Sequence, residues 1–165
     1  MRKIFLLLSA VWLCSSLHAQ TPQGKKFGLG IMLGDPTGLT AKIAVSRENE
    51  ITLSAGTSYF GSLRLGIDYT WRFDVFRSPI LHLYTGPGAV VGIGHSDGFI
   101  YKSYNGRFYF RPAGESGLAV RGIVGLDFTL QHDPIEFFFE VGPLVGIIPA
   151  FGSSMDAAIG IRFYP

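Results

Sequence analysis

The sequence predicts an all-β protein, a closed antiparallel eight-stranded transmembrane β-barrel, and three observations lead to this prediction. Residues 63–73 alternate large apolar side chains with polar or small ones over eleven positions, which is the period of a β-strand. A strand that crosses a bilayer needs about 9–11 residues, whereas most strands are about 5–6 residues long. The same alternation recurs along the chain, and the charged residues keep to one face of it.

The first residues have the order of charge and hydropathy of a secretory signal peptide. Arg2 and Lys3 precede a ten-residue apolar run, which is too short to span a membrane as a helix. We place the cleavage after Ala19, so that residues 1–19 are the signal peptide and residues 20–165 form the barrel domain.

Removal of this leader changes the composition. Loss of Arg2 and Lys3 leaves twelve basic and twelve acidic residues, so nothing in the net charge indicates a nucleic-acid partner. The only cysteine, Cys14, is also removed with the leader, so we expect neither a disulfide nor thiol chemistry in the mature chain. A lipoprotein interpretation of Cys14 is disfavoured because bulky Trp12 and Leu13 precede it.

Eight segments with strand periodicity follow the leader. The expected strands are residues 26–33, 39–46, 51–58, 63–73, 80–94, 118–130, 135–148 and 155–163. Gly-Asp-Pro-Thr-Gly at 34–38 and Arg-Glu-Asn-Glu at 47–50 are turns by composition, and residues 59–62 lead into the longest alternating segment of this half. Residues 74–79 and 131–134 end with proline and close two further hairpins.

Two of the later strands contain a Gly-Pro pair in mid-strand. Gly86-Pro87 and Gly142-Pro143 are each followed by valine and glycine within three residues. Because proline cannot donate to a strand ladder, we expect a β-bulge at each pair.

The distribution of charge is the strongest argument for a membrane barrel. If the apolar parity faces lipid, ten charged residues point inward and none points outward. They are Lys42, Arg64, Asp68, Arg72, Arg121, Asp127, Glu136, Glu140, Asp156 and Arg162. A basic residue on the lipid face costs about 2–4 kcal/mol at mid-bilayer, so lipid imposes this segregation. Since the set is five basic and five acidic, we expect charge pairs to plug the narrow lumen.

One long loop separates the fifth and sixth strands, at residues 95–117. With the N-terminus on the periplasmic side, it is the third outer loop, and it mixes aromatic with basic residues. The residues expected to bind a partner are Phe99, Tyr101, Lys102, Tyr104, Arg107, Phe108, Tyr109 and Arg111. The alternative is that this loop is an interfacial girdle.

Several segments resemble one family of small, uncharacterised bacterial outer-membrane β-barrel proteins. The matching segments are residues 34–42, 67–72, 84–88, 134–141 and 160–164. The resemblance spans nearly the whole mature chain and implies the barrel fold, but no settled activity. The chain departs from the pattern at its end, where Pro165 follows Tyr164, because such barrels end on an aromatic residue that the assembly machinery reads.

The expected role is non-enzymatic: a bacterial outer-membrane protein, exported through a cleaved signal peptide, that is structural or binds a surface partner. Expected partners are outer-membrane lipid, lipopolysaccharide, the barrel-assembly machinery and an unidentified surface ligand, with the chain a monomer. One alternative is a lipid A-modifying hydrolase that uses His95 and Ser96, although adjacency alone satisfies no catalytic geometry. Another is a soluble lipocalin-like binder. No cofactor or metal is expected, since His82, His95 and His132 have no metal-ligand spacing.

Overall fold

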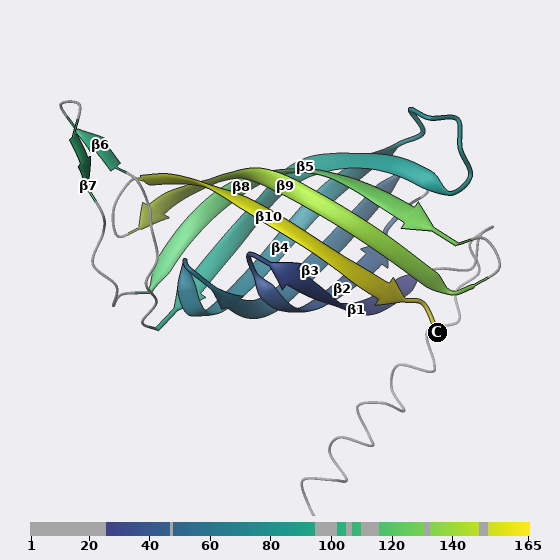
Figure 1. Ribbon diagram of the computed structural model, residues 1–165, viewed down its shortest axis with the longest axis horizontal. Coiled ribbons are helices and arrows are strands. Elements are labelled where there is room, and N and C mark those ends of the chain that lie inside the picture. Colours follow the sequence, from purple (N-terminus) through teal and green to yellow (C-terminus); the bar gives the residue numbers. More distant parts are fainter. Residues whose placement is uncertain are drawn as a thin grey trace, which may run out of the picture.

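A computed structural model describes residues 26–46, 48–94, 102–104, 107–109, 116–130, 133–148 and 152–165. Its eight long strands form one closed antiparallel barrel, as predicted (Figure 1). In the order in which they pair around the barrel, these are β1 (Phe27–Gly34), β10 (Gly152–Phe163), β9 (Ile135–Ile148), β8 (Gly117–Thr129), β5 (Leu81–Ile93), β4 (Gly61–Phe73), β3 (Asn49–Ser58) and β2 (Thr37–Ala44). Short β6 (Lys102–Tyr104) and β7 (Arg107–Tyr109) pair separately as a two-stranded sheet. Among the described residues, no helix is long and apolar enough to cross a membrane.

The barrel closes where its first and last strands meet. Leu29 pairs with Phe163, and Gly34 pairs with Ala158, in one antiparallel register. The C-terminus therefore lies at the same end of the barrel as the start of β1, and we call this the terminal end (Figure 1, right). The links β1–β2, β3–β4, β5–β8 and β9–β10 lie at the opposite end, which we call the loop end.

The outer surface of the barrel is apolar. In β4 the residues at odd positions from Leu63 to Phe73 are exposed, while Arg64, Asp68 and Thr70 between them are buried. The same alternation runs through the strands on both sides, and the exposed set consists of large aliphatic and aromatic residues. The structure thus has the inside-out distribution of side chains that is typical of a transmembrane barrel.

The prediction of a β-bulge at each of the two Gly-Pro pairs is wrong. β4 pairs with β5 at Asp68–Gly88 and again at Trp71–Thr85 without a change of register, so no residue is inserted at Pro87. At Pro143, β9 likewise keeps one register with both of its neighbours. The prolines remove hydrogen bonds from the ladder, but their outward rings leave the strand path unchanged. The register shifts occur elsewhere, at Gly56/Ser58 and at Leu118/Ala119.

Two strands begin earlier than the turn composition predicted. β2 starts at Thr37, within the expected Gly-Asp-Pro-Thr-Gly turn, and β3 starts at Asn49, within the expected polar turn. Thr37 explains the first difference, because its hydroxyl donates to the carbonyl oxygen of Gly34 at 2.8 Å and so closes a tighter turn. The second difference has consequences for the lumen, because it turns Glu50 inward.

Candidate functional site

The candidate site is the interior of the barrel. All ten charged residues predicted for the lumen lie on the inner faces of their strands. Nine are buried, and the side chain of Arg72 is 21% exposed near the terminal end. Burial of so many charges is costly unless each is paired, so the contacts among them determine what the lumen can do.

Lys42 of β2 is the centre of the network in the terminal half. Its Nζ lies 2.9 Å from Glu50, 3.1 Å from Asp127 and 3.1 Å from Glu136, on three other strands. Arg72 adds contacts of 2.7 Å to Glu50 and 3.2 Å to Asp127. Each carboxylate in this half therefore lies within 4 Å of at least two cationic groups.

Arg162 and Tyr164 complete the surroundings of Glu136. The Nη1 of Arg162 donates to Glu136 at 2.9 Å, and the hydroxyl of Tyr164 donates to the same carboxylate at 2.7 Å. The guanidinium of Arg162 also lies 3.7 Å from the ring centroid of Phe138, a cation–π contact. His82 Nδ1 lies 3.1 Å from Asp127 Oδ1 at the edge of the network.

A second group of charges fills the half of the lumen nearer the loop end. Arg121 binds Asp68 through two hydrogen bonds and lies 3.3 Å from Glu140 and 3.6 Å from Asp156. Arg64 pairs with Asp156 and, at 3.2 Å, with Asp35 of the β1–β2 turn.

Tyr84 connects the two halves. Its hydroxyl donates to Glu140 at 3.1 Å, and Lys42 Nζ lies 5.4 Å from the centre of its ring. The ring lies over Gly125, where an added Cβ would come within 2.2 Å of it. An inward glycine therefore leaves the space that the tyrosine fills, and the polar network runs without interruption along the lumen.

Two members of this network, Asp35 and Glu50, are not predicted from the sequence. Composition places both of them in turns. Glu50 shares the inward parity of Thr52 and Ser54, so extending the periodicity of β3 by one pair of residues would have found it. No periodicity reaches Asp35, which lies between strands. The network of the described residues therefore contains five basic and seven acidic residues, and the expected balance of charge is wrong by two carboxylates.

An apolar cluster closes the loop end of the lumen. Phe60 of the β3–β4 link turns inward and packs against Val90, Ala119 and Leu144, with Tyr59 partly buried beside it. The ring lies so close to the backbone of β8 that a Cβ at Gly117 would come within 3.0 Å of its tip. Polar groups, together with the buried rings of Phe60, Tyr84, Phe138 and Tyr164, fill the lumen.

The groups at the loop end have altered acidity. Burial raises the pKa of Asp35 above its ordinary 3.8, with a further contribution from Asp156, and these effects outweigh Ser58 and Arg64, which lower the pKa. Burial and the nearby Asp156 carboxylate also raise the pKa of Tyr59, whose hydroxyl donates to Asp156 at 2.6 Å. Two carboxylates of this half, those of Asp35 and Asp156, therefore lie beside the single guanidinium of Arg64.

Of the residues expected to bind a partner, Phe99, Tyr101 and Arg111 lie outside the described residues. Lys102 and Tyr104 belong to β6, and residues 107–109 form β7. His95 and Ser96 also lie outside the described residues. Within the described ranges, no group of three His, Cys, Asp or Glu side chains is arranged to hold a metal ion.

Comparison with models of protein families and with curated proteins found no match to this chain.

Proposed function

We propose that this chain is a bacterial outer-membrane barrel of non-enzymatic function. The observation that carries the proposal is the segregation of charge: no charged side chain of the eight barrel strands faces outward, and the outward face is apolar. A soluble protein would expose this surface to water at a large cost in free energy. The soluble lipocalin-like alternative also needs an apolar or open interior, whereas this interior is filled with ion pairs.

The charge network favours a structural role for the barrel wall over transport. An eight-stranded barrel encloses a lumen just wide enough for side chains. Here Lys42 and Arg121 each bridge carboxylates from several strands, and Phe60 lies across the loop end. We therefore infer a barrel that holds itself closed and conducts no solute, and that belongs to the family of small, uncharacterised outer-membrane barrels noted above.

Specific recognition then falls to the long loop between β5 and β8. The wall is engaged with lipid outside and with itself inside, whereas Phe99, Tyr101 and their basic neighbours remain for a surface ligand or lipopolysaccharide. Loops longer than about 12–15 residues in compact proteins are usually functional or disordered. In this proposal a signal peptide directs export, the assembly machinery inserts the chain, and the protein acts as a monomer.

The location and the closed lumen are tested together. Membrane fractionation of expressing cells should place the protein in the outer membrane, and unheated detergent gels should show a compact, faster-migrating band. Purified protein in planar bilayers should show no stable channel. Recovery in the soluble fraction would refute the membrane location, and a steady porin-like conductance would refute the plugged lumen.

The role of the loop requires a separate variant. Residues 98–114 are replaced by a short Gly/Ser link, and the barrel is expected to keep its heat-modifiable migration. Any partner captured from the medium by the full protein should be lost. The enzyme alternative is tested by lipid A mass spectra from cells with and without the protein, where we expect identical spectra.

A further inference from the structure

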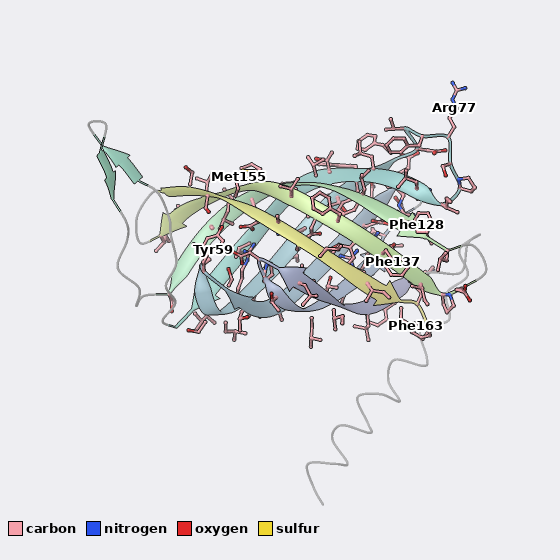
Figure 2. All side chains as sticks on the ribbon, viewed as in Figure 1. Tyr59, Arg77, Phe128, Phe137, Met155 and Phe163 are labelled. Carbon is pink, nitrogen blue, oxygen red and sulfur yellow. The ribbon has the colours of Figure 1, made fainter. Side chains whose placement is uncertain are left out.

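The exposed aromatic residues of the barrel gather at one end. The large exposed aromatics of the described residues are Tyr69, Trp71, Phe73, Phe76, Phe128, Phe137, Phe139 and Phe163. All but Phe76 lie within five residues of a strand terminus at the terminal end, and Figure 2 shows Phe128, Phe137 and Phe163 there. Tyr69 and Trp71 pack edge to face, with ring centroids 5.5 Å apart. This belt has the composition of a membrane–water interface.

The β4–β5 turn, residues 74–80, extends this belt beyond the barrel wall. Val75 and Phe76 are 60% and 49% exposed, and only Asp74 separates them from the last belt residue of β4, Phe73. The turn projects sideways from the terminal end, and Arg77 points away from the barrel (Figures 1 and 2, upper right). Two adjacent apolar side chains are thus presented outside the strands, beside a cation.

Arg77 occupies a backbone conformation that favours glycine. Its φ is +47°, in the left-handed region. Arg77 is the last residue of the turn 74–77, and its N–H donates to the carbonyl oxygen of Asp74 at 3.5 Å. Such a conformation costs a residue with a Cβ free energy that glycine does not lose. Among the described residues its guanidinium has no ion-pair partner. Neither the backbone conformation nor an ion pair within the described residues accounts for an arginine here, and its side chain is available to a partner outside the chain.

The residues of this turn match one kind of surface. The headgroup layer of a bilayer presents acyl chains on one side and phosphates on the other, within reach of a single turn. Apolar side chains at that depth are buried, and a guanidinium binds phosphate by two parallel hydrogen bonds. The turn is also continuous with the aromatic belt through Phe73.

We propose that the β4–β5 turn is a phospholipid anchor. Val75 and Phe76 enter the boundary between headgroups and acyl chains, and Arg77 binds a lipid phosphate in the leaflet that surrounds the terminal end. This inference rests on the proposed membrane location, and it adds a lipid-binding site outside the barrel wall.

Tryptophan fluorescence tests the depth of the turn. In the chain without residues 1–19, Trp71 is the only tryptophan. One sample keeps Trp71, and a second carries Trp71→Phe with Phe76→Trp; both are refolded into vesicles of phosphatidylethanolamine and phosphatidylglycerol. Lipids brominated on the acyl chain should quench both samples. Quenching of Trp71 alone, with water-like emission from position 76, would overturn the anchor and leave the membrane barrel intact; this is also the result expected if the turn binds a soluble protein instead. Absence of quenching in both would overturn the proposed function itself.

Variants of Arg77 test the phosphate contact in the position-76 reporter. Arg77→Gln should lower the ratio of embedded to free turns by about fivefold, since one basic residue near an anionic surface contributes about 1 kcal/mol. Arg77→Lys keeps the charge and should retain most of the quenching. High salt should reduce the difference between Arg77→Gln and the parent. Equal quenching in the parent and Arg77→Gln at low salt would overturn the role of the guanidinium.

Discussion

Arg121 of β8 binds Asp68 of β4 directly over the backbone of Gly88, which lies on the strand between them. The Nε of Arg121 donates to Oδ1 at 2.6 Å and its Nη2 to Oδ2 at 2.5 Å. Gly88 is in register with both residues, pairing with Asp68 on one side and with Arg121 on the other. The two-bond ion pair therefore joins β4 to β8 across β5, and it exists because the residue between them has no side chain.

Gly88→Ala should break this pair. The added Cβ would lie 1.9 Å from Asp68 Oδ1 and 3.1 Å from Arg121 Cγ, so the carboxylate must move. We expect a loss of about 1–3 kcal/mol from overpacking, with more if the arginine is left without Asp68. Urea unfolding of protein refolded in vesicles measures this. Gly122→Ala is the matched control, because a Cβ there meets its nearest atom, in the ring of Pro143, at 3.7 Å. Equal stability of the two variants would show that the pair is dispensable.

The two buried glutamates of β9 should differ in what they contribute. Glu136 contacts Lys42 at 3.1 Å and Arg162 at 2.9 Å, and Glu136→Gln leaves both cations short of a counter-charge. We expect a loss of about 3–5 kcal/mol, as when one partner of a buried pair is removed.

Glu140 provides the comparison on the same strand. It contacts one cation, Arg121, at 3.3 Å, and it belongs to the half of the lumen with more acidic than basic residues. Glu140→Gln should therefore cost less than about 1 kcal/mol, since the net contribution of an ordinary hydrogen bond is of that order. The same urea titrations rank the two variants, and a larger loss for Glu140→Gln would mean that the division into two halves is wrong.

Asp35→Asn should change the pH dependence of stability. The pKa of Asp35 is raised in the folded barrel, mainly by burial, so the folded state binds this proton more tightly than the unfolded chain does. Its favourable contribution is complete below the ordinary 3.8 and is lost as the pH rises through the raised folded pKa. The free-energy difference between Asp35→Asn and the parent should thus grow in favour of the variant over that interval and stay constant above it. Urea unfolding at a series of pH values measures the difference. A trend of opposite sign would mean that the ion pair with Arg64 lowers the pKa of Asp35 more than burial raises it.

Periodicity was enough to predict the wall of the barrel, because lipid and lumen impose opposite chemistry on alternate residues. Ile67 and Asp68 show this at its clearest: one is half exposed on the outer surface and the other is buried inside. The rule fails where the chain leaves the strand. Asp35 and Phe60 both turn into the lumen from links, and turn composition carries no information about which side of the wall a side chain takes.

The Gly-Pro pairs show a second limit of the sequence. Proline removes a donor, and that much can be read from residues 87 and 143, but a lost hydrogen bond does not require an inserted residue. Whether the strand bulges depends on the neighbouring strands, which here keep their register on both sides. The pairing of individual charges was equally out of reach, because Lys42 contacts Asp127 and Glu136 on β8 and β9, two strands that are distant in the sequence.

The lipid-facing assignment itself is tested by an arginine scan at two depths. Ile67 lies in the middle of β4, is 51% exposed, and is flanked on its row by Leu53 and Ala89, so it faces the centre of the apolar band. Ile67→Arg should cost about 2–4 kcal/mol, because a guanidinium at mid-bilayer has neither water nor a partner. Val75→Arg places the same side chain on another exposed residue, 60% accessible, at the edge of the band, where the cost falls to about 0–1 kcal/mol. Unfolding in vesicles gives both values, and Ile67→Leu corrects for the loss of isoleucine packing. If the two arginines cost the same in vesicles, Ile67 does not face the bilayer centre and the lipid-facing assignment is wrong.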